Sequence, residues 1–182
     1  MRLDLDHLLE LLQTRGHERY TGEPVSHLQH ALQTAELAQA DGASPALITA
    51  TLLHDIGHLL HGRPGTPSVR GIDDRHEVIA ATVLFSLLGP DVSEPVRLHV
   101  AAKRRLCRDP RYLAALSEDS QRSLALQGGP MSAGEGEVFD ALPYARDAIR
   151  LRQWDDQAKS GHARPPPLSH FASLARQVPP PG

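Results

Sequence analysis

The chain has 182 residues, of which 40% are hydrophobic, and its formal net charge is −3 with the histidines neutral. This length and apolar content suit one globular domain with a core of its own. The slight negative charge gives no electrostatic reason to expect DNA, RNA or an anionic membrane as a partner, so we expect a small-molecule substrate.

Cys107 is the only cysteine, so no disulfide can form within the chain, and a reducing compartment is expected. No apolar run approaches the roughly 18 residues of a membrane span, and the opening MRLDLDHLLE lacks the layout of a signal peptide. These features predict a cytoplasmic protein that is a monomer or a small homo-oligomer.

The first half of the chain shows helical patterns separated by loops. Leucines at helical spacing precede Gly16, and the YTGEP loop (20–24) is followed by a helix from Ser26 to about Ala40. The stretch SPALITATLLHDIGHLLHG (44–62) then predicts one uninterrupted helix, with Ser44 as its cap and Gly62 at its end.

The second half continues in the same way. A Gly/Pro loop precedes a helix that Asp73 or Asp74 caps and Gly89 stops, and SEPVRLHVAAKRRL (93–106) predicts another helix. The segment 108–134 is broken by Pro and Gly, and a last helix is predicted from about Glu135 to Lys159.

No segment alternates with period two for long enough to predict a strand. The expected fold is therefore all-α, a compact bundle of about six or seven helices with a dinuclear metal site in its core. Residues 1–160 would form the domain, and the Pro-rich residues 161–182 a tail that is packed on the surface or partly mobile.

Each of four consecutive predicted helices carries a histidine that could be a ligand: His30, His54, His76 and His99. Asp55 follows His54 directly, and the last helix carries two further aspartates, Asp155 and Asp156. Imidazole and carboxylate together are ligands of iron, manganese, zinc or nickel, and a carboxylate can bridge two ions. Four converging helices could supply a two-metal site.

A single histidine on an apolar helix face is more often a hydrogen-bonded core residue than a ligand, and this interpretation applies to His30, His76 or His99 taken alone. The pair His54–Asp55 is harder to explain that way, because leucine and isoleucine flank it on both sides. Burying two ionisable side chains is costly unless something pairs with them.

His30, His54, Asp55 and a late aspartate follow one another in an order that resembles the motif of the HD-domain superfamily of metal-dependent phosphohydrolases. A narrower resemblance spans about Tyr20 to Lys159, to HD-domain oxygenases that cleave the carbon–phosphorus bond of hydroxylated phosphonates and that are themselves similar to myo-inositol oxygenase. The segments that carry it, in order, are YTGEPVSHLQHALQ, ALITATLLHDIGHLL, DDRHEVIAATVL, VRLHVAAKRRLC, SLALQGGPMS and RQWDDQAK.

The resemblance implies two iron ions in a mixed-valence Fe(II)/Fe(III) pair, with O2 as co-substrate. The first iron would be held by His30, His54 and Asp155, and the second by His76 and His99, with Asp55 bridging. Helix periodicity admits either Asp155 or Asp156 as the ligand. The resemblance favours Asp155, because inositol oxygenase places its ligand aspartate four residues before a lysine of its site, here Lys159. Asp156 would then pair with Arg152 at i,i+4.

Further residues fit an anionic substrate. His58 and Lys103 each follow a ligand by one helical turn, and with Arg152 and Lys159 they would hold a phosphonate. Asp55, His58 and Lys103 are the catalytic candidates. A solvated basic run explains Lys103 equally well from the sequence alone, since it opens KRR (103–105).

Four more substrate contacts are implied by the resemblance only. Tyr20 and Glu23 lie in a loop that closes over the site in the resembling family, where the glutamate contacts the substrate's amino group. Ser123 and Gln127 lie in SLALQGGPM, a segment that forms part of the substrate pocket. A half-buried tyrosine, a turn glutamate and a tight loop are the simpler interpretations of these residues.

The expected function is a diiron oxygenase that converts a small 1-hydroxyphosphonate, first of all 2-amino-1-hydroxyethylphosphonate, to phosphate and glycine. The alternative is an HD-domain phosphohydrolase that acts on a nucleotide with two divalent metals and no O2. A regulatory domain without catalysis is a third interpretation, against which stands the presence of every expected ligand.

Overall fold

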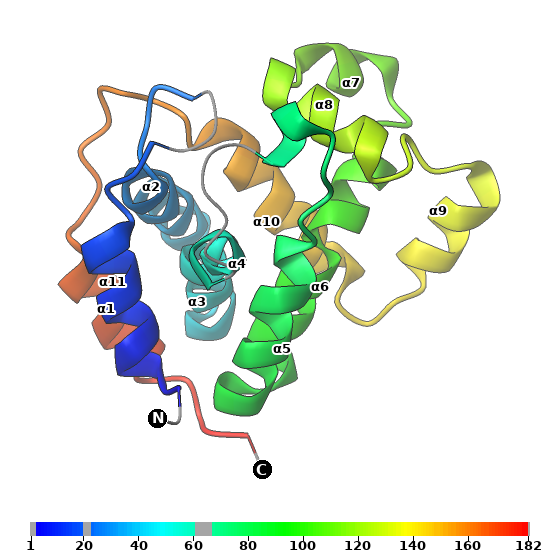
Figure 1. Ribbon diagram of the computed structural model, residues 1–182. Coiled ribbons are helices and arrows are strands. Elements are labelled where there is room, and N and C mark those ends of the chain that lie inside the picture. Colours follow the sequence, from blue (N-terminus) through cyan, green and yellow to red (C-terminus); the bar gives the residue numbers. More distant parts are fainter. Residues whose placement is uncertain (1–2, 20–22, 61–66, 182) are drawn as a thin grey trace.

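The computed structural model describes residues 3–19, 23–60 and 67–181, and the described part of the chain is almost entirely helical (Figure 1). The prediction of an all-α fold is confirmed: these ranges contain no strand, only an isolated bridge between Arg19 and Ser26. No described helix has the length and apolar character needed to cross a membrane. The elements are α1 (Leu5–Arg15), α2 (His27–Ala40), α3 (Pro45–Leu53), α4 (Ile56–Leu60), a 3₁₀ turn η1 (Pro67–Arg70), α5 (His76–Leu88), α6 (Pro90–Leu106), α7 (Pro110–Ala115), α8 (Glu118–Leu126), α9 (Ala133–Asp140), α10 (Ala145–Gln157) and α11 (Leu168–Ala175).

The main core lies between α2, α3, α5, α6 and α10, with α1 and α11 packed on its outer side (Figure 1). Among its best-buried side chains are five leucines from four different helices, and each is no more than 2% exposed: Leu8, Leu52, Leu53, Leu84 and Leu151. Helices α7, α8 and α9 lie on the side of the bundle away from α1 and α11 (Figure 1). The core thus holds the five helices that carry or adjoin the predicted ligands (α2, α3, α5, α6 and α10) in fixed relative positions.

The helix predicted over 44–62 is interrupted at His54 and Asp55, so that prediction is wrong in its middle. Helix α3 ends at Leu53, and the amide of His58 donates to the carbonyl of Asp55, three residues back, at 3.0 Å. This tighter hydrogen bond replaces the four-residue spacing of an α-helix. The HD pair therefore occupies a turn between two helices. The predicted stop at Gly62 lies outside the described residues.

Other boundaries also differ from the predictions. The last long helix is two helices, α9 and α10, because Leu142, Pro143 and Tyr144 form a turn between them. The broken segment 108–134 contains α7 and α8, and α6 begins already at Pro90, in its favoured place in a first turn. The expected six or seven helices were too few, since the described residues form eleven.

Helix α11 lies in the segment that was predicted as a Pro-rich tail, and it was not predicted. Phe171 on this helix is 1% exposed and belongs to the main core, which also takes up Ala172. The spacing of Leu168, Phe171, Ala172 and Ala175 is that of one helix face and could have indicated the helix. The prolines on either side bound the helix rather than exclude it.

Gly57 sets how closely α4 approaches α5. A Cβ atom at position 57 would lie 2.1 Å from the carbonyl oxygen of His76, a rigid backbone group. We expect Gly57→Ala to destabilise the protein by about 3 kcal/mol, the upper range for overpacking, because α5 must move away. Chemical denaturation measures this loss, with Gly134→Ala in α9 as the control, where an added Cβ meets no atom within 4 Å. Equal stability of the two variants would contradict this packing.

Candidate metal centre

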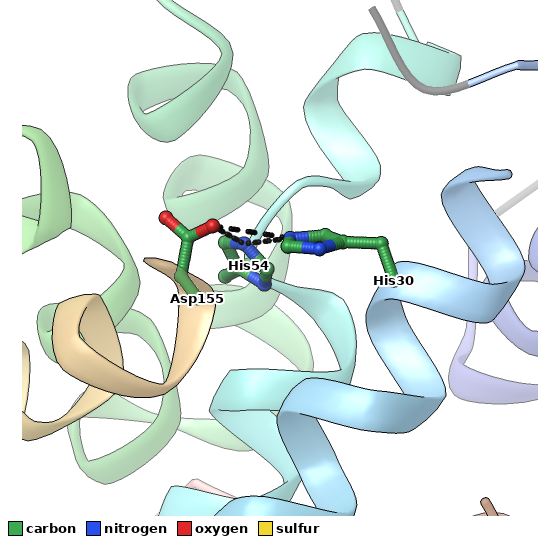
Figure 2. A group of neighbouring side chains, drawn as sticks. All are labelled: His30, His54 and Asp155. Atoms are coloured by element: carbon green, nitrogen blue, oxygen red, sulfur yellow. Dashed lines mark hydrogen bonds and ion pairs between the residues drawn. The ribbon is translucent and has the colours of Figure 1, made fainter. Parts of the chain in front are cut away.

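Three side chains from separate elements meet in the core with their polar atoms facing one another. Nε2 of His30 lies 3.2 Å from Oδ1 of Asp155 and 3.3 Å from Nε2 of His54, and all three residues are at most 2% exposed (Figure 2). They come from α2, the end of α3 and α10. Two imidazoles and a carboxylate buried in this way could hold one metal ion.

Asp55, His76 and His99 form a second such group beside the first. Nε2 of His76 lies 3.2 Å from Nε2 of His99 and 3.4 Å from Oδ1 of Asp55. The other carboxylate oxygen of Asp55, Oδ2, faces the first group and lies 3.3 Å from Nε2 of His54. Asp55 therefore presents one oxygen to each group, which is the geometry that a bridging ligand requires.

The outer nitrogens of these rings are held by the protein, which directs their Nε2 atoms inward. Nδ1 of His30 donates to the carbonyl of Ala158 at 2.9 Å, and Nδ1 of His54 to that of Thr51 at 2.8 Å. Nδ1 of His99 donates to the carbonyl of Val96 at 2.7 Å. Metal-binding histidines use their second nitrogen in this way, so the arrangement fits a metal pair.

The electrostatics of the site also suit cations. Burial alone would raise the pKa of Asp55, but His54 beside it outweighs this and holds the pKa well below its usual range. Burial likewise opposes ionisation of Asp155, yet Arg152 holds its pKa well below the usual range. Burial and the neighbouring His76 hold the pKa of His99 well below its usual value. Ionised carboxylates and a neutral His99 are forms that bind metals. At His54 burial would lower the pKa, but the charge of Asp55 outweighs this and raises the pKa to about 9, so a bound metal would displace a proton there.

The structure distinguishes the two consecutive aspartates of α10. Asp155 is 2% exposed and lies in the first group, whereas Asp156 turns away and binds the Arg152 guanidinium and the hydroxyl of Tyr112. The predicted i,i+4 pair of Arg152 and Asp156 is present. Arg152 also donates to Oδ2 of Asp155 at 2.7 Å, so its charge is shared between two carboxylates.

A cavity of about 60 Å³ opens beside the second group, and it brings together most of the predicted substrate residues. At roughly 10–15 Å³ for each water, this space holds a handful of waters or one small molecule. Nζ of Lys103 donates to the hydroxyl of Ser123 at 2.8 Å, although Lys103 is only 3% exposed. The candidate residues that line the cavity are Asp55, His58, His76, His99, Lys103, Ser123, Gln127, Arg152 and Asp155.

The remaining substrate candidates are placed differently. Nζ of Lys159 donates to Oε1 of Glu23 at 3.0 Å and to the hydroxyl of Ser117 at 3.3 Å, so these two predicted contacts pair with each other. Neither Glu23 nor Lys159 is among the described residues that line the cavity. Tyr20, the other residue of that loop, lies outside the described residues.

Asp74 was considered from the sequence only as a helix cap, and the structure places it differently. The residue before α5 is Arg75, in a left-handed conformation with φ 51°, and its own side chain makes no capping hydrogen bond. The Asp74 carboxylate instead accepts hydrogen bonds from the rings of His58 and His76. Its position two residues before a candidate ligand was the available signal, but such spacing is common.

Comparisons with known proteins agree with this geometry. The family model described as HD domain matches residues 27–141, more than half of the chain. The chain belongs to the HD-domain family. It is 42% identical over 166 residues to hydroxymethylphosphonate dioxygenase of Gimesia maris, covering 90% of this chain and 82% of that protein. It is also 39% identical over 170 residues to [1-hydroxy-2-(trimethylamino)ethyl]phosphonate dioxygenase (glycine-betaine-forming) of Leisingera caerulea, covering 92% and 86%.

Both of these relatives are dioxygenases named for phosphonates, so this HD-domain protein is an O2-dependent oxygenase, as the sequence resemblance implied. The matched range of the HD-domain model contains every candidate ligand except one. Asp155 lies beyond its end, in α10, and the fold brings it back to His30. The last carboxylate of the centre is thus supplied from outside the matched range.

Proposed function

We propose that this HD-domain oxygenase holds two iron ions and cleaves the carbon–phosphorus bond of a small 1-hydroxyphosphonate with O2. The substrate proposed is 2-amino-1-hydroxyethylphosphonate. Its C1 carbon becomes the carboxyl carbon of glycine and its phosphorus leaves as phosphate, so substrate and one O2 account for all atoms of both products. The observation that carries the proposal is the pair of ligand groups that share Asp55 and open on a cavity whose lining includes Lys103 and Arg152.

The proposed ligands of the first iron are His30, His54 and Asp155, and those of the second are His76 and His99, with Asp55 bridging. When bound, the iron pair would supply O2 activation and the oxidation of the substrate at C1. The inward Nε2 atoms and the two faces of the Asp55 carboxylate support this assignment. The protein's own part is to hold these ligands and to orient the substrate.

Lys103 is the proposed anchor of the phosphonate. It lines the cavity, and its ammonium donates to the Ser123 hydroxyl and forms no ion pair with any other described residue, whereas Arg152 is bound to two carboxylates. The side chains of Ser123 and Gln127 line the same wall and can add hydrogen bonds. His58 also lines the cavity, with its Nε2 4.0 Å from Oδ1 of Asp55, and would face the reacting carbon's hydroxyl. The charge of Arg152 would act mainly by holding Asp155.

The small size of the cavity, about 60 Å³, favours a small phosphonate over a nucleotide, which carries a base and a sugar besides its phosphate. Relatives are named for a hydroxymethyl substrate and for one that carries a trimethylamino group. The proposed substrate lies between these two in size. We assign the ammonium of the substrate to Glu23. Glu23 would give up its ion pair with Lys159 for one with this ammonium, and Lys159 would then turn toward the phosphonate.

The test compares kcat/KM for three phosphonates: hydroxymethylphosphonate, 2-amino-1-hydroxyethylphosphonate and the trimethylamino analogue. We expect the highest value for the amino compound, with glycine and phosphate formed in equal amounts. Glu23→Gln should lower this preference and leave turnover of hydroxymethylphosphonate nearly unchanged, because that substrate has no amine. A higher kcat/KM for either other compound would replace the proposed substrate with that compound.

The pH dependence of kcat/KM should report Lys103. Burial, and next the charge of Arg152, lower the pKa of Lys103 to about 7. The ammonium is charged below this pKa and neutral above it, so kcat/KM for the phosphonate should fall as the pH rises through about 7. In Lys103→Met this fall should disappear, at a kcat/KM below that of the wild type throughout. The same fall in Lys103→Met would assign it to another group.

A further inference from the structure

One carboxylate, that of Asp74, binds two of the histidine rings at the site. Its Oδ2 accepts a hydrogen bond from Nδ1 of His58 at 2.7 Å, and its Oδ1 accepts one from Nδ1 of His76 at 3.0 Å. Asp74 itself is 9% exposed. The two rings belong to different elements, α4 and the start of α5, so Asp74 links a cavity-lining histidine to a proposed iron ligand.

The two rings also lie together as a unit. They stack with centroids 4.0 Å apart and planes inclined by 21°. Their Nε2 atoms both face the bridging carboxylate: Nε2 of His76 lies 3.4 Å, and that of His58 4.0 Å, from Oδ1 of Asp55. Any rotation of Asp74 would therefore move both rings relative to the proposed metal pair.

An ionised carboxylate can only accept hydrogen bonds, so both Nδ1 atoms must carry a proton. A neutral imidazole that is protonated on Nδ1 has its lone pair on Nε2. This is the tautomer that His76 needs to bind a metal, and it makes Nε2 of His58 an acceptor at the cavity. The alternative role of Asp74, as the cap of α5, is supported less well, since its bond to the amide of His76 is 3.4 Å long.

We infer that Asp74 is a positioning residue of this oxygenase, which fixes the tautomer and orientation of His58 and His76 together. The inference rests on the proposed function in one respect, that His76 binds one of the two irons. It adds that the cavity-lining histidine and the iron ligand share a single support, so that neither can be reoriented alone. It also makes His58 a hydrogen-bond acceptor toward the substrate hydroxyl.

The first test uses the metal-free wild-type protein and does not depend on the function. Long-range ¹H–¹⁵N NMR of the histidine side chains distinguishes the two tautomers, and His58→Gln assigns the signals of His58. Both His58 and His76 are expected to be protonated on Nδ1. A proton on Nε2 in place of Nδ1 in either ring would overturn the inference, whatever the activity of the enzyme.

The second test is Asp74→Asn. The asparagine amide has the shape of the carboxylate, but its oxygen accepts hydrogen bonds whereas its NH2 group only donates them. It can serve only one ring in the present tautomer, so we expect the affinity for the second Fe(II), titrated anaerobically, to fall about 10- to 100-fold. Asp73→Asn is the matched control: it removes the same charge one residue away, where the carboxylate accepts a hydrogen bond from the amide of Arg75 and contacts neither histidine ring, and it should retain both irons.

The outcomes separate this inference from the proposed function. Wild-type protein that binds no second Fe(II) contradicts the proposed metal pair, while the NMR result still decides the tautomers. Wild-type and Asp74→Asn proteins that bind two irons with equal affinity refute the positioning role alone. A general structural effect of Asp74→Asn would lower the unfolding midpoint without changing the ring tautomers in the folded protein, and that result also counts against the inference.

Discussion

Asp55→Ala should remove both the metal pair and the O2-dependent activity. Its carboxylate faces both ligand groups, Oδ2 toward His54 and Oδ1 toward His76. We expect iron content to fall well below two per chain and turnover to fall by more than about 1000-fold, equivalent to the several kcal/mol that a bound metal contributes. Iron analysis of the reconstituted protein and phosphate release measure the two effects.

Two further variants should lose only part of the metal pair. Asp55→Asn keeps one oxygen and should bind iron at one group better than at the other, whereas His54→Ala removes a ligand of the first group only. Asp41, an exposed aspartate after α2, provides a control that lies outside the site, and Asp41→Ala should behave as the wild type. Retention of two irons per chain by Asp55→Ala would show that Asp55 does not bridge them.

The paired variants Asp155→Ala and Asp156→Ala should differ strongly despite being neighbours. Asp155 faces His30 at 3.2 Å, so its loss removes a proposed ligand and should lower activity by more than about 1000-fold. Asp156 binds Arg152 and Tyr112 away from the metal groups. Its loss leaves the bond of Arg152 to Asp155 in place, and activity should fall by less than about tenfold.

The comparison of the two variants is internally controlled, because each removes one carboxylate from the same turn of α10. Iron content, measured beside activity, separates loss of a ligand from loss of folding. A larger loss of iron in Asp156→Ala than in Asp155→Ala would reverse the proposed assignment. Comparable losses in both would indicate that the Arg152 network, rather than a single ligand, holds this side of the site.

The helical fold class and the candidate ligands could be predicted from local patterns in the sequence. Caps and glycines bounded most helices, and histidines in four successive helices stood out against an apolar background. What periodicity could not show was the break at His54–Asp55. A turn that keeps helical dihedral angles but loses one hydrogen bond has the same apolar pattern as a continuous helix.

The contacts that hold the candidate site residues in place could not be predicted for a different reason, since they join residues that are distant in the sequence. Tyr112 meets Asp156 across 44 positions, and Lys159 meets Glu23 across 136. No local pattern indicates such pairs. Asp74 was visible as a carboxylate near His76, but its contact with His58 depends on how α4 packs against α5. The ligand candidates could therefore be predicted, whereas their supports required the structure.

Phosphate release is the most direct measurement of the central claim. Protein loaded with Fe(II) and partly oxidised is given 2-amino-1-hydroxyethylphosphonate, with and without O2, and phosphate, glycine and O2 consumption are followed. We predict that phosphate and glycine appear only with O2, one of each for every O2 consumed. Phosphate release that is equal without O2, or hydrolysis of a nucleotide by the anaerobic protein with divalent metal, would contradict oxidative cleavage of a carbon–phosphorus bond.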